Sequence, residues 1–183
     1  MTTNNYDYII LGAGSAGCVL ANRMSENTRH KVCLLEAGPE DKTPMIKIPG
    51  AFAYFMFKTK YSWGFDAKPV SDIRNGQPVH SPRGRTLGGS SAVNGMVYIR
   101  GHQTDYDTWQ DLGNKGWGFD SMLPYFKRAE TNQRGSDEFH GADGPLYVSD
   151  PVNNYTLNTS FIQAGQEAGL PLSTDFNNTN TFE

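Results

Sequence analysis

Apolar residues gather in short runs near the start of the chain, and their spacing changes from one run to the next. Residues 6–11 (YDYIIL) form an apolar run that ends in glycines, which is typical of a buried β-strand. Residues 18–26 (CVLANRMSE) have a helical spacing without a helix breaker, and residues 31–38 (KVCLLEAG) again read as a buried strand. This strand–helix–strand order predicts a parallel sheet and an α/β fold.

The pattern becomes irregular after residue 38. Residues 39–80 carry repeated prolines and a dense aromatic stretch from Phe52 to Phe65, so we expect a long irregular segment with short helical pieces. Residues 140–150 should form a turn that leads into a strand. Further helices are expected at Thr104–Leu112, at Asp120–Glu130 with Asp120 as its N-cap, and at Asn158–Gly169.

Composition excludes several classes of protein. The 183 residues include 16 Lys and Arg against 19 Asp and Glu, a net charge of −3, which argues against electrostatic binding of nucleic acid. No apolar run approaches the roughly 18 residues that cross a bilayer, and the N-terminus lacks the features of a secretory signal.

Cysteine and histidine usage adds little chemistry. The two cysteines form no CxxC, so we expect a cytoplasmic location and place Cys18 and Cys33 as small buried residues. The 4 histidines show no metal-ligand spacing, so we expect no metal site and assign them surface or turn positions.

The segment GAGSAG at residues 12–17 matches the dinucleotide-binding pattern GxGxxG in its usual context, between a predicted strand and a predicted helix. Gly12 is expected to make the tight turn, Gly14 to let the backbone approach a pyrophosphate, and Gly17 to let the helix pack on the strand. Glu36 ends the next strand and would accept hydrogen bonds from an adenosine ribose. This pattern by itself does not decide between NAD and FAD.

A second glycine-rich segment, residues 84–107 (GRTLGGSSAVNGMVYIRGHQTDYD), resembles the first signature of the glucose–methanol–choline (GMC) family of flavin oxidoreductases. Further agreement comes from LLEAG at 34–38, YSWGF at 61–65 and HGADGP at 140–145. Within the family, the chain is most similar to choline dehydrogenases and to dehydrogenases of aliphatic alcohols.

The resemblance implies FAD-dependent oxidation of a primary alcohol, choline or an aliphatic alcohol, to the aldehyde by hydride transfer to flavin N5. It implies an incomplete Rossmann-like FAD-binding domain over residues 1–150 and the start of an α+β substrate-binding domain over 151–183. The electron acceptor stays open between a quinone, a dye and oxygen. Peripheral association of the parent enzyme with the inner face of the membrane also stays open.

The resemblance also assigns cofactor-binding residues. Ser15 and Ala16 should contact the pyrophosphate, and Ala37 should lie beside the ribose. Some members attach FAD covalently through a histidine at the position where this chain has Val93, so we expect FAD to be bound non-covalently. The loop expected to wrap the flavin ring and its ribityl chain carries Thr86, Ser90, Asn94, Gly95, Met96 and Val97.

Several roles stay undecided at this stage. Trp63 matches a position near the substrate cavity of some relatives, although packing of the whole cluster Phe52–Phe65, in the core or as a cover of the cofactor, is the interpretation we favour. The catalytic histidine of the family lies far downstream, so no catalytic residue is assigned here, and the chain is expected to supply FAD binding only. The alternatives are an NAD-linked dehydrogenase domain, against which residues 84–107 argue, and a truncated, catalytically inactive fragment.

Overall fold

In the computed structural model of the chain, residues 5–57, 59–68, 76–152 and 155–178 are described. The chain divides into two compact units, Met1–Val97 (unit 1) and Tyr98–Glu183 (unit 2). The domain boundary expected near residue 150 stays a prediction. Within the described ranges, every helix falls short of the length and hydropathy that crossing a bilayer requires.

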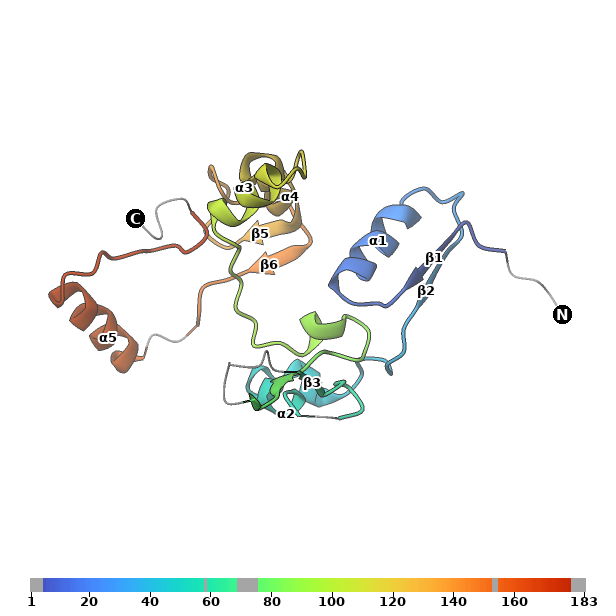
Figure 1. Ribbon diagram of the computed structural model, residues 1–183, viewed down its shortest axis with the longest axis horizontal. Helices are drawn as coiled ribbons and strands as arrows, with labels where there is room; N and C mark the ends of the chain where they lie inside the picture. Colours follow the sequence, from blue (N-terminus) through green and yellow to red (C-terminus); the bar gives the residue numbers. More distant parts are fainter. Residues whose placement is uncertain (1–4, 58, 69–75, 153–154, 179–183) are drawn as a thin grey trace. The chain divides into compact units, whose positions relative to one another are not determined.

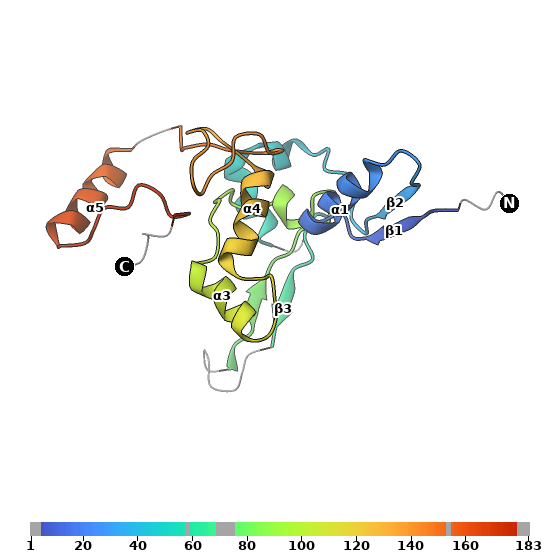
Figure 2. The same ribbon diagram turned by 90° about the horizontal axis from the view of Figure 1, so that it is seen from above.

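Unit 1 begins with the predicted strand–helix–strand order: β1 (Tyr8–Leu11), α1 (Ser15–Ser25) and β2 (Val32–Leu35). The two strands pair in parallel, with Tyr8 opposite Val32 and Leu11 opposite Leu35, which confirms the prediction. Helix α1 packs against both strands (Figures 1 and 2). It starts earlier than the apolar pattern indicated because Gly14, with φ −76° and ψ −171°, is its N-cap.

The remainder of unit 1 consists of short elements. The helical pieces η1 (Pro44–Lys47), η2 (Pro49–Ala51) and α2 (Phe52–Phe55) confirm the short helices expected in this segment. The sequence did not predict the antiparallel pair of β3 (Phe65–Ala67) and β4 (Val79–Ser81) or the 3₁₀ turn η4 (Gly89–Ala92).

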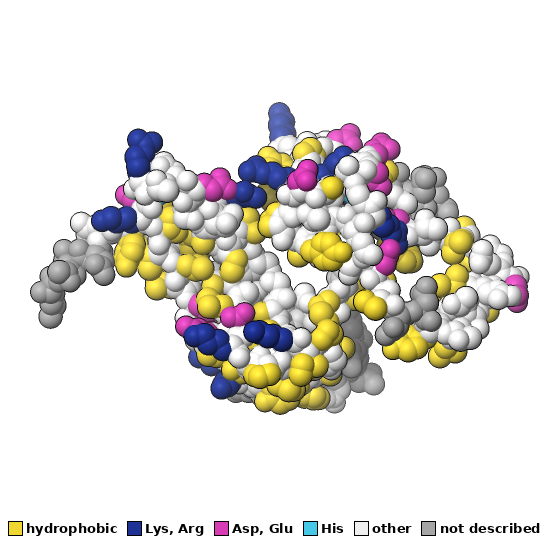
Figure 3. Space-filling model, turned by 180° about the vertical axis from the view of Figure 1, so that it is seen from behind, with side chains coloured by type: hydrophobic (Ala, Val, Ile, Leu, Met, Phe, Trp, Pro, Cys, Tyr) yellow, Lys and Arg dark blue, Asp and Glu magenta, His cyan; other side chains and the backbone are white. Residues whose placement is uncertain are grey.

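The aromatic stretch is only partly a packing core. Phe55 and Tyr61 are 2% and 9% exposed, and their rings meet edge to face at 6.0 Å. Phe52, Phe57 and Trp63 remain exposed, so core packing is confirmed for Phe55 and Tyr61, and packing of the other residues against a cofactor stays a prediction. Hydrophobic side chains accordingly gather on the surface over the segment that carries α2 (Figure 3).

Unit 2 contains α3 (Gln103–Asp111), α4 (Phe119–Ala129), β5 (Glu130–Asn132), β6 (Leu146–Val148) and α5 (Thr156–Glu167). Strands β5 and β6 pair in parallel. Between α3 and α4, the buried Tyr106 ring contacts the rings of Trp109, Phe119 and Phe126 at centroid distances of 5.5, 6.0 and 5.6 Å. These aromatic contacts form the core of this helix pair.

Three details of the two units differ from the sequence prediction. Helix α4 starts after Gly118, so Asp120 lies in its first turn and is not its N-cap. Glu130 opens strand β5 instead of ending the helix. Cys18 and Cys33, in unit 1, are half-buried and not buried as expected.

The surface or turn position assigned to His140 is wrong, because this side chain belongs to a charged cluster in which Arg100, Glu130 and His140 have buried side chains and Asp175 is half-buried. His140 Nδ1 lies 3.0 Å from Glu130 Oε1, and its Nε2 lies 2.9 Å from Asp175 Oδ2. Arg100 pairs with the other oxygen of Glu130, whose side chain is 0% exposed. Ion pairing therefore permits a burial that the sequence pattern of a loop histidine did not indicate.

Candidate functional site

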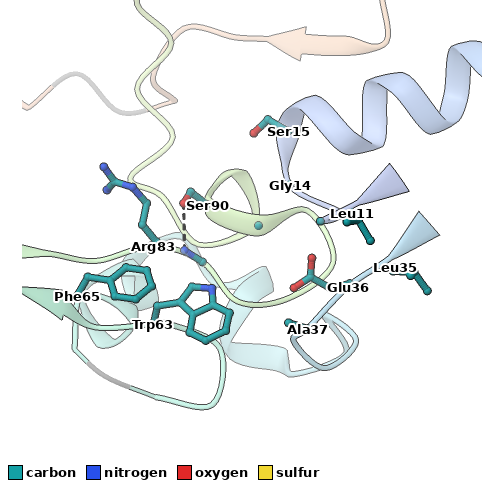
Figure 4. A pocket seen from close by; sticks show the side chains of 13 residues that line it. Leu11, Gly14, Ser15, Leu35, Glu36, Ala37, Trp63, Phe65, Arg83 and Ser90 are labelled. Carbon is teal, nitrogen blue, oxygen red and sulfur yellow. Dashed lines mark hydrogen bonds between the residues drawn. The ribbon is translucent and has the colours of Figure 1, made fainter. Parts of the chain in front are cut away.

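A cavity of about 690 Å³ opens in unit 1 beside the glycine turn that joins β1 to α1. Its size lies within the usual range of ligand-binding clefts. Backbone of the turn, the end of β2, the start of β3 and the segment after β4 surround it (Figure 4). The lining residues are Leu11, Gly12, Gly14, Ser15, Leu35, Glu36, Ala37, Trp63, Phe65, Arg83, Gly84, Gly89 and Ser90.

The glycines of the turn have different reasons for lacking a side chain. Gly12 has φ +93°, a left-handed conformation that favours glycine. A Cβ at Gly17 would lie 1.9 Å from the Gly12 carbonyl oxygen, so the helix start packs directly on the turn. A Cβ at Gly14 would meet nothing within 4 Å, so packing of the chain does not require this glycine. The space in front of Gly14 belongs to the cavity, where a ligand could approach the helix N-terminus.

Glu36 is held in place at the end of β2 by backbone donors. The Ala13 N–H donates to its Oε2 and the Gly38 N–H to its Oε1, both at 2.8 Å. A carboxylate oxygen can accept more than one hydrogen bond, so both oxygens can still accept from a ligand hydroxyl. Because it bonds Ala13, the side chain also fixes the glycine turn itself.

The second glycine-rich motif packs directly on the first. The Gly88 N–H donates to the Ala13 carbonyl oxygen at 2.7 Å. A Cβ at Gly89 would lie 2.7 Å from Gly14 Cα, so backbone meets backbone at this point. Motifs that lie some seventy residues apart in the sequence therefore form one assembly around the cavity.

Aromatic side chains form the wall opposite Glu36. The rings of Trp63 and Phe65 stack with centroids 5.7 Å apart and an interplanar angle of 10° (Figure 4). The backbone N–H of Trp63 donates to the Arg83 carbonyl oxygen at 2.8 Å, which ties this wall to the segment that precedes Gly84. Flat apolar rings of this kind suit the face of an aromatic ligand.

The structure brings together about half of the residues that the sequence assigned to the cofactor. Six of them line the cavity: Gly12, Gly14, Ser15, Glu36, Ala37 and Ser90. Ser90 Oγ accepts from the Gly84 N–H at 3.0 Å, which shapes the loop at the cavity edge (Figure 4).

The other assigned residues lie outside the lining. Gly17 is buried and Ala16 is exposed, both in the first turn of α1. The Thr86 side chain is 0% exposed, and its hydroxyl donates to the Pro39 carbonyl oxygen at 2.7 Å. A contact between these residues and a cofactor stays a prediction.

The stretch from Asn94 to Val97 is exposed and does not line the cavity. Met96 has φ 58°, and its N–H donates to Asn94 Oδ1 at 3.0 Å. Gly95 lies between them within this turn. The expected contacts of Asn94, Gly95, Met96 and Val97 with the flavin also stay predictions.

Sequence reasoning did not assign several lining residues to the cofactor. Gly84 and Gly89 stand inside the second motif, and their position among its glycines is a sequence signal that could have identified them. Trp63, Phe65 and Arg83 reach the cavity through the pairing of the β3–β4 region, which no local pattern indicated.

Residues 6–182 match the family described as GMC oxidoreductase. The oxygen-dependent choline dehydrogenase of Vibrio vulnificus (strain YJ016) is 52% identical over 176 residues, covering 94% of this chain and 31% of the relative. The alcohol dehydrogenase [acceptor] of Pseudomonas putida is 49% identical over 173 residues. The match covers 94% of this chain and 31% of the length of that dehydrogenase.

Solved structures give the same picture. Pyridoxine 4-oxidase from Mesorbium loti has a TM-score of 0.83 at 39% identity, and the match covers 91% of this chain and 33% of the oxidase chain. A formate oxidase has a TM-score of 0.84 at 27% identity, and the match covers 96% of this chain and 32% of the formate oxidase chain. The chain thus spans about a third of the length of these relatives. Such neighbours imply a flavin cofactor.

Proposed function

The chain belongs to the GMC oxidoreductase family, and we propose that it binds FAD for the oxidation of a primary alcohol, choline or an aliphatic alcohol, to the aldehyde. The observation that carries the proposal is the open backbone surface at Gly14. This glycine lacks any packing reason to be a glycine, yet it faces the cavity at the start of α1. A pyrophosphate at this point would meet the unpaired N–H groups of the helix N-terminus.

The residues around the cavity suit the parts of FAD. Gly14 and Ser15 would hold the pyrophosphate, and Glu36 would accept from the ribose hydroxyls while Ala37 lies beside them. FAD, when bound, would accept the hydride that leaves the carbon of the alcohol. The chain's own residues bind and orient it, and no catalytic base is assigned among them.

The names of the relatives support the substrate class. The choline dehydrogenase and the alcohol dehydrogenase are named for oxidising alcohols. The electron acceptor stays open between oxygen, a quinone and a dye, and association of the parent enzyme with a membrane stays open as well. Non-covalent binding of FAD is proposed from Val93, whose side chain cannot form the bond that a histidine forms with the flavin.

Isothermal titration of the 183-residue chain with FAD and, separately, with NAD tests the proposal. We expect saturable binding of FAD and no comparable binding of NAD. Acid precipitation of the loaded chain should release the flavin into the supernatant. Preferential binding of NAD would contradict the cofactor assignment, and flavin retained in the pellet would contradict its non-covalent attachment.

The alcohol is tested on a protein that carries this chain within the full length of its relatives. Choline and a medium-chain aliphatic alcohol are compared as reductants of the bound flavin under anaerobic conditions. Bleaching of the flavin absorbance by one of the two identifies the substrate class. If neither reduces the flavin, the proposed substrate class is wrong.

A further inference from the structure

Arg85 lies behind the aromatic wall of the cavity. Its guanidinium carbon is 4.6 Å from the centroid of the Trp63 ring. Trp63 lines the cavity, as do the neighbouring Arg83 and Gly84, whereas Arg85 does not. The guanidinium therefore contacts a side chain that faces the ligand space without facing it itself.

Backbone hydrogen bonds fix both partners of this contact. The Arg85 N–H donates to the Tyr61 carbonyl oxygen at 2.7 Å, and the Trp63 N–H donates to the Arg83 carbonyl oxygen at 2.8 Å. A bridge between Ser62 and Gly84 lies between these two bonds. The segments are thus paired on both sides of the contact, so the stacking of guanidinium on indole is not a chance meeting of two mobile surface side chains.

The charge of Arg85 has no acidic partner in the described part of the chain, where no carboxylate lies within ion-pair distance of it. The side chain is half-buried, and its Nε has no hydrogen-bond partner. A cation partly removed from water without a counter-ion costs free energy, and the face of an indole ring is an attractive surface for such a cation. The Trp63 ring is therefore the principal contact for this charge.

We propose that Arg85 is a positioning residue, which holds the Trp63 ring in the cavity wall and thereby strengthens binding of FAD. The proposal rests on the proposed function for its ligand, but the contact itself does not. Arg85 acts through Trp63, so its effect on FAD affinity disappears when Trp63 is replaced. A cation acting directly on the phosphates or the flavin would keep its effect without Trp63.

The first measurement needs no cofactor. Trp109→Phe and Trp117→Phe, both in unit 2, leave Trp63 as the single tryptophan of the chain. In this background, quenching of Trp63 emission by acrylamide reports how freely the ring is accessible. Arg85→Met should raise the quenching constant, and Arg85→Lys should raise it less because the charge is kept. Arg128→Met, which removes an exposed arginine from unit 2, is the matched control and should leave it unchanged.

The second measurement is a double-mutant cycle on the dissociation constant for FAD, followed by flavin fluorescence. Arg85→Met should raise this constant about three- to tenfold when Trp63 is present. The same substitution combined with Trp63→Leu should add no further loss to that of Trp63→Leu alone. Equal losses with and without Trp63, or unchanged acrylamide quenching, would overturn the proposal.

The two measurements separate the two claims. A chain that binds no FAD but still shows increased quenching in Arg85→Met would contradict the proposed function and support the positioning contact. A chain that binds FAD but shows no change of Trp63 quenching in Arg85→Met would support the proposed function and contradict the positioning contact.

Discussion

The cavity of unit 1 and the charged cluster of unit 2 are built in opposite ways. Around the cavity, backbone groups meet one another at glycines, and Ala13, at 0% exposure, bonds both Glu36 and Gly88 through its own peptide groups. In the cluster, Arg100, Glu130 and His140 are buried side chains, with Arg100 paired to one oxygen of Glu130 and His140 Nδ1 3.0 Å from the other. Added side-chain atoms should therefore disrupt the cavity, whereas removal of side-chain atoms should destabilise the cluster.

The same contrast separates binding from stability. Loss of a charge in the cluster leaves another charge buried without a partner, which lowers the free energy of unfolding. Atoms added at a glycine of the cavity either disturb the packing of two loops or fill the ligand space. Which of these occurs depends on whether a Cβ at that glycine would meet the chain or the open cavity.

The largest effect is expected from Glu130→Ala in the cluster. This change leaves the guanidinium of Arg100 and the imidazole of His140 buried without their shared carboxylate. We expect the free energy of unfolding of unit 2 to fall by about 3–5 kcal/mol. Urea unfolding in a Trp63→Phe background, where Trp109 and Trp117 are the remaining tryptophans, measures it through their emission. Glu138→Ala, which removes an exposed carboxylate from the same unit, should change little; an equal loss in both variants would contradict this account of the cluster.

Gly89→Ala tests the close approach of the two glycine-rich motifs. Gly89 has φ +55°, and an added Cβ would lie 2.7 Å from Gly14 Cα. Left-handed backbone costs a residue with a side chain about 1–2 kcal/mol, and the clash adds to this, so we expect unit 1 to lose about 2 kcal/mol or more. Thermal unfolding of Gly50→Ala is the control, because a Cβ there meets nothing within 4 Å. Similar midpoints for the two variants would show that the motifs can separate without cost.

Glu36→Ala should weaken FAD binding by about 1–3 kcal/mol, because the ribose hydroxyls and the Ala13 N–H lose a charged acceptor. Glu36→Gln should lose less, since the amide keeps one acceptor oxygen. Calorimetric titration with FAD gives both values. Glu40→Ala, an exposed carboxylate nearby, is the control. An FAD affinity unchanged by Glu36→Ala would show that Glu36 has no role in binding the cofactor.

The smallest effect concerns the β3–β4 pair. The hydrogen bond from His80 to Asp66 and then that to the Met56 carbonyl oxygen raise the pKa of His80 above its ordinary value of 6.5. A raised folded-state pKa means that the contribution to stability is fully present below 6.5 and is lost as pH rises through the folded-state pKa. The thermal midpoint should therefore decline slightly over this window. Asp66→Asn should reduce this decline of the thermal midpoint. If the pH profile of the variant equals that of the unaltered chain, the decline arises from groups other than His80.

The sequence predicted the parts of the cavity whose conformation is local. The strand–helix–strand unit and the glycine turn follow from apolar periodicity and from residues 12–17 alone, and the structure confirms the parallel pairing. Strands β3 and β4 escaped prediction because each has only three residues and their pairing joins segments that no local periodicity connects. Trp63 and Phe65 reach the cavity through that pairing.

The cluster was not predictable from local pattern. His140 stands in a glycine-rich turn, so its sequence neighbourhood is typical of an exposed residue. Its burial depends on Glu130, ten positions earlier, and on Asp175, which lies in a different segment. A single sequence contains no signal for such long-range charge pairing.

The most direct test of the central claim is a titration of Gly14→Val with FAD. The added Cβ would meet no atom of the chain within 4 Å, and the valine side chain would extend into the cavity at the helix N-terminus. We expect the FAD dissociation constant to rise by about 100-fold or more while the thermal midpoint stays at that of the unaltered chain. Gly50→Val, at a glycine outside the cavity, should keep both values. FAD binding by Gly14→Val with undiminished affinity would contradict the assignment of this turn as the cofactor site.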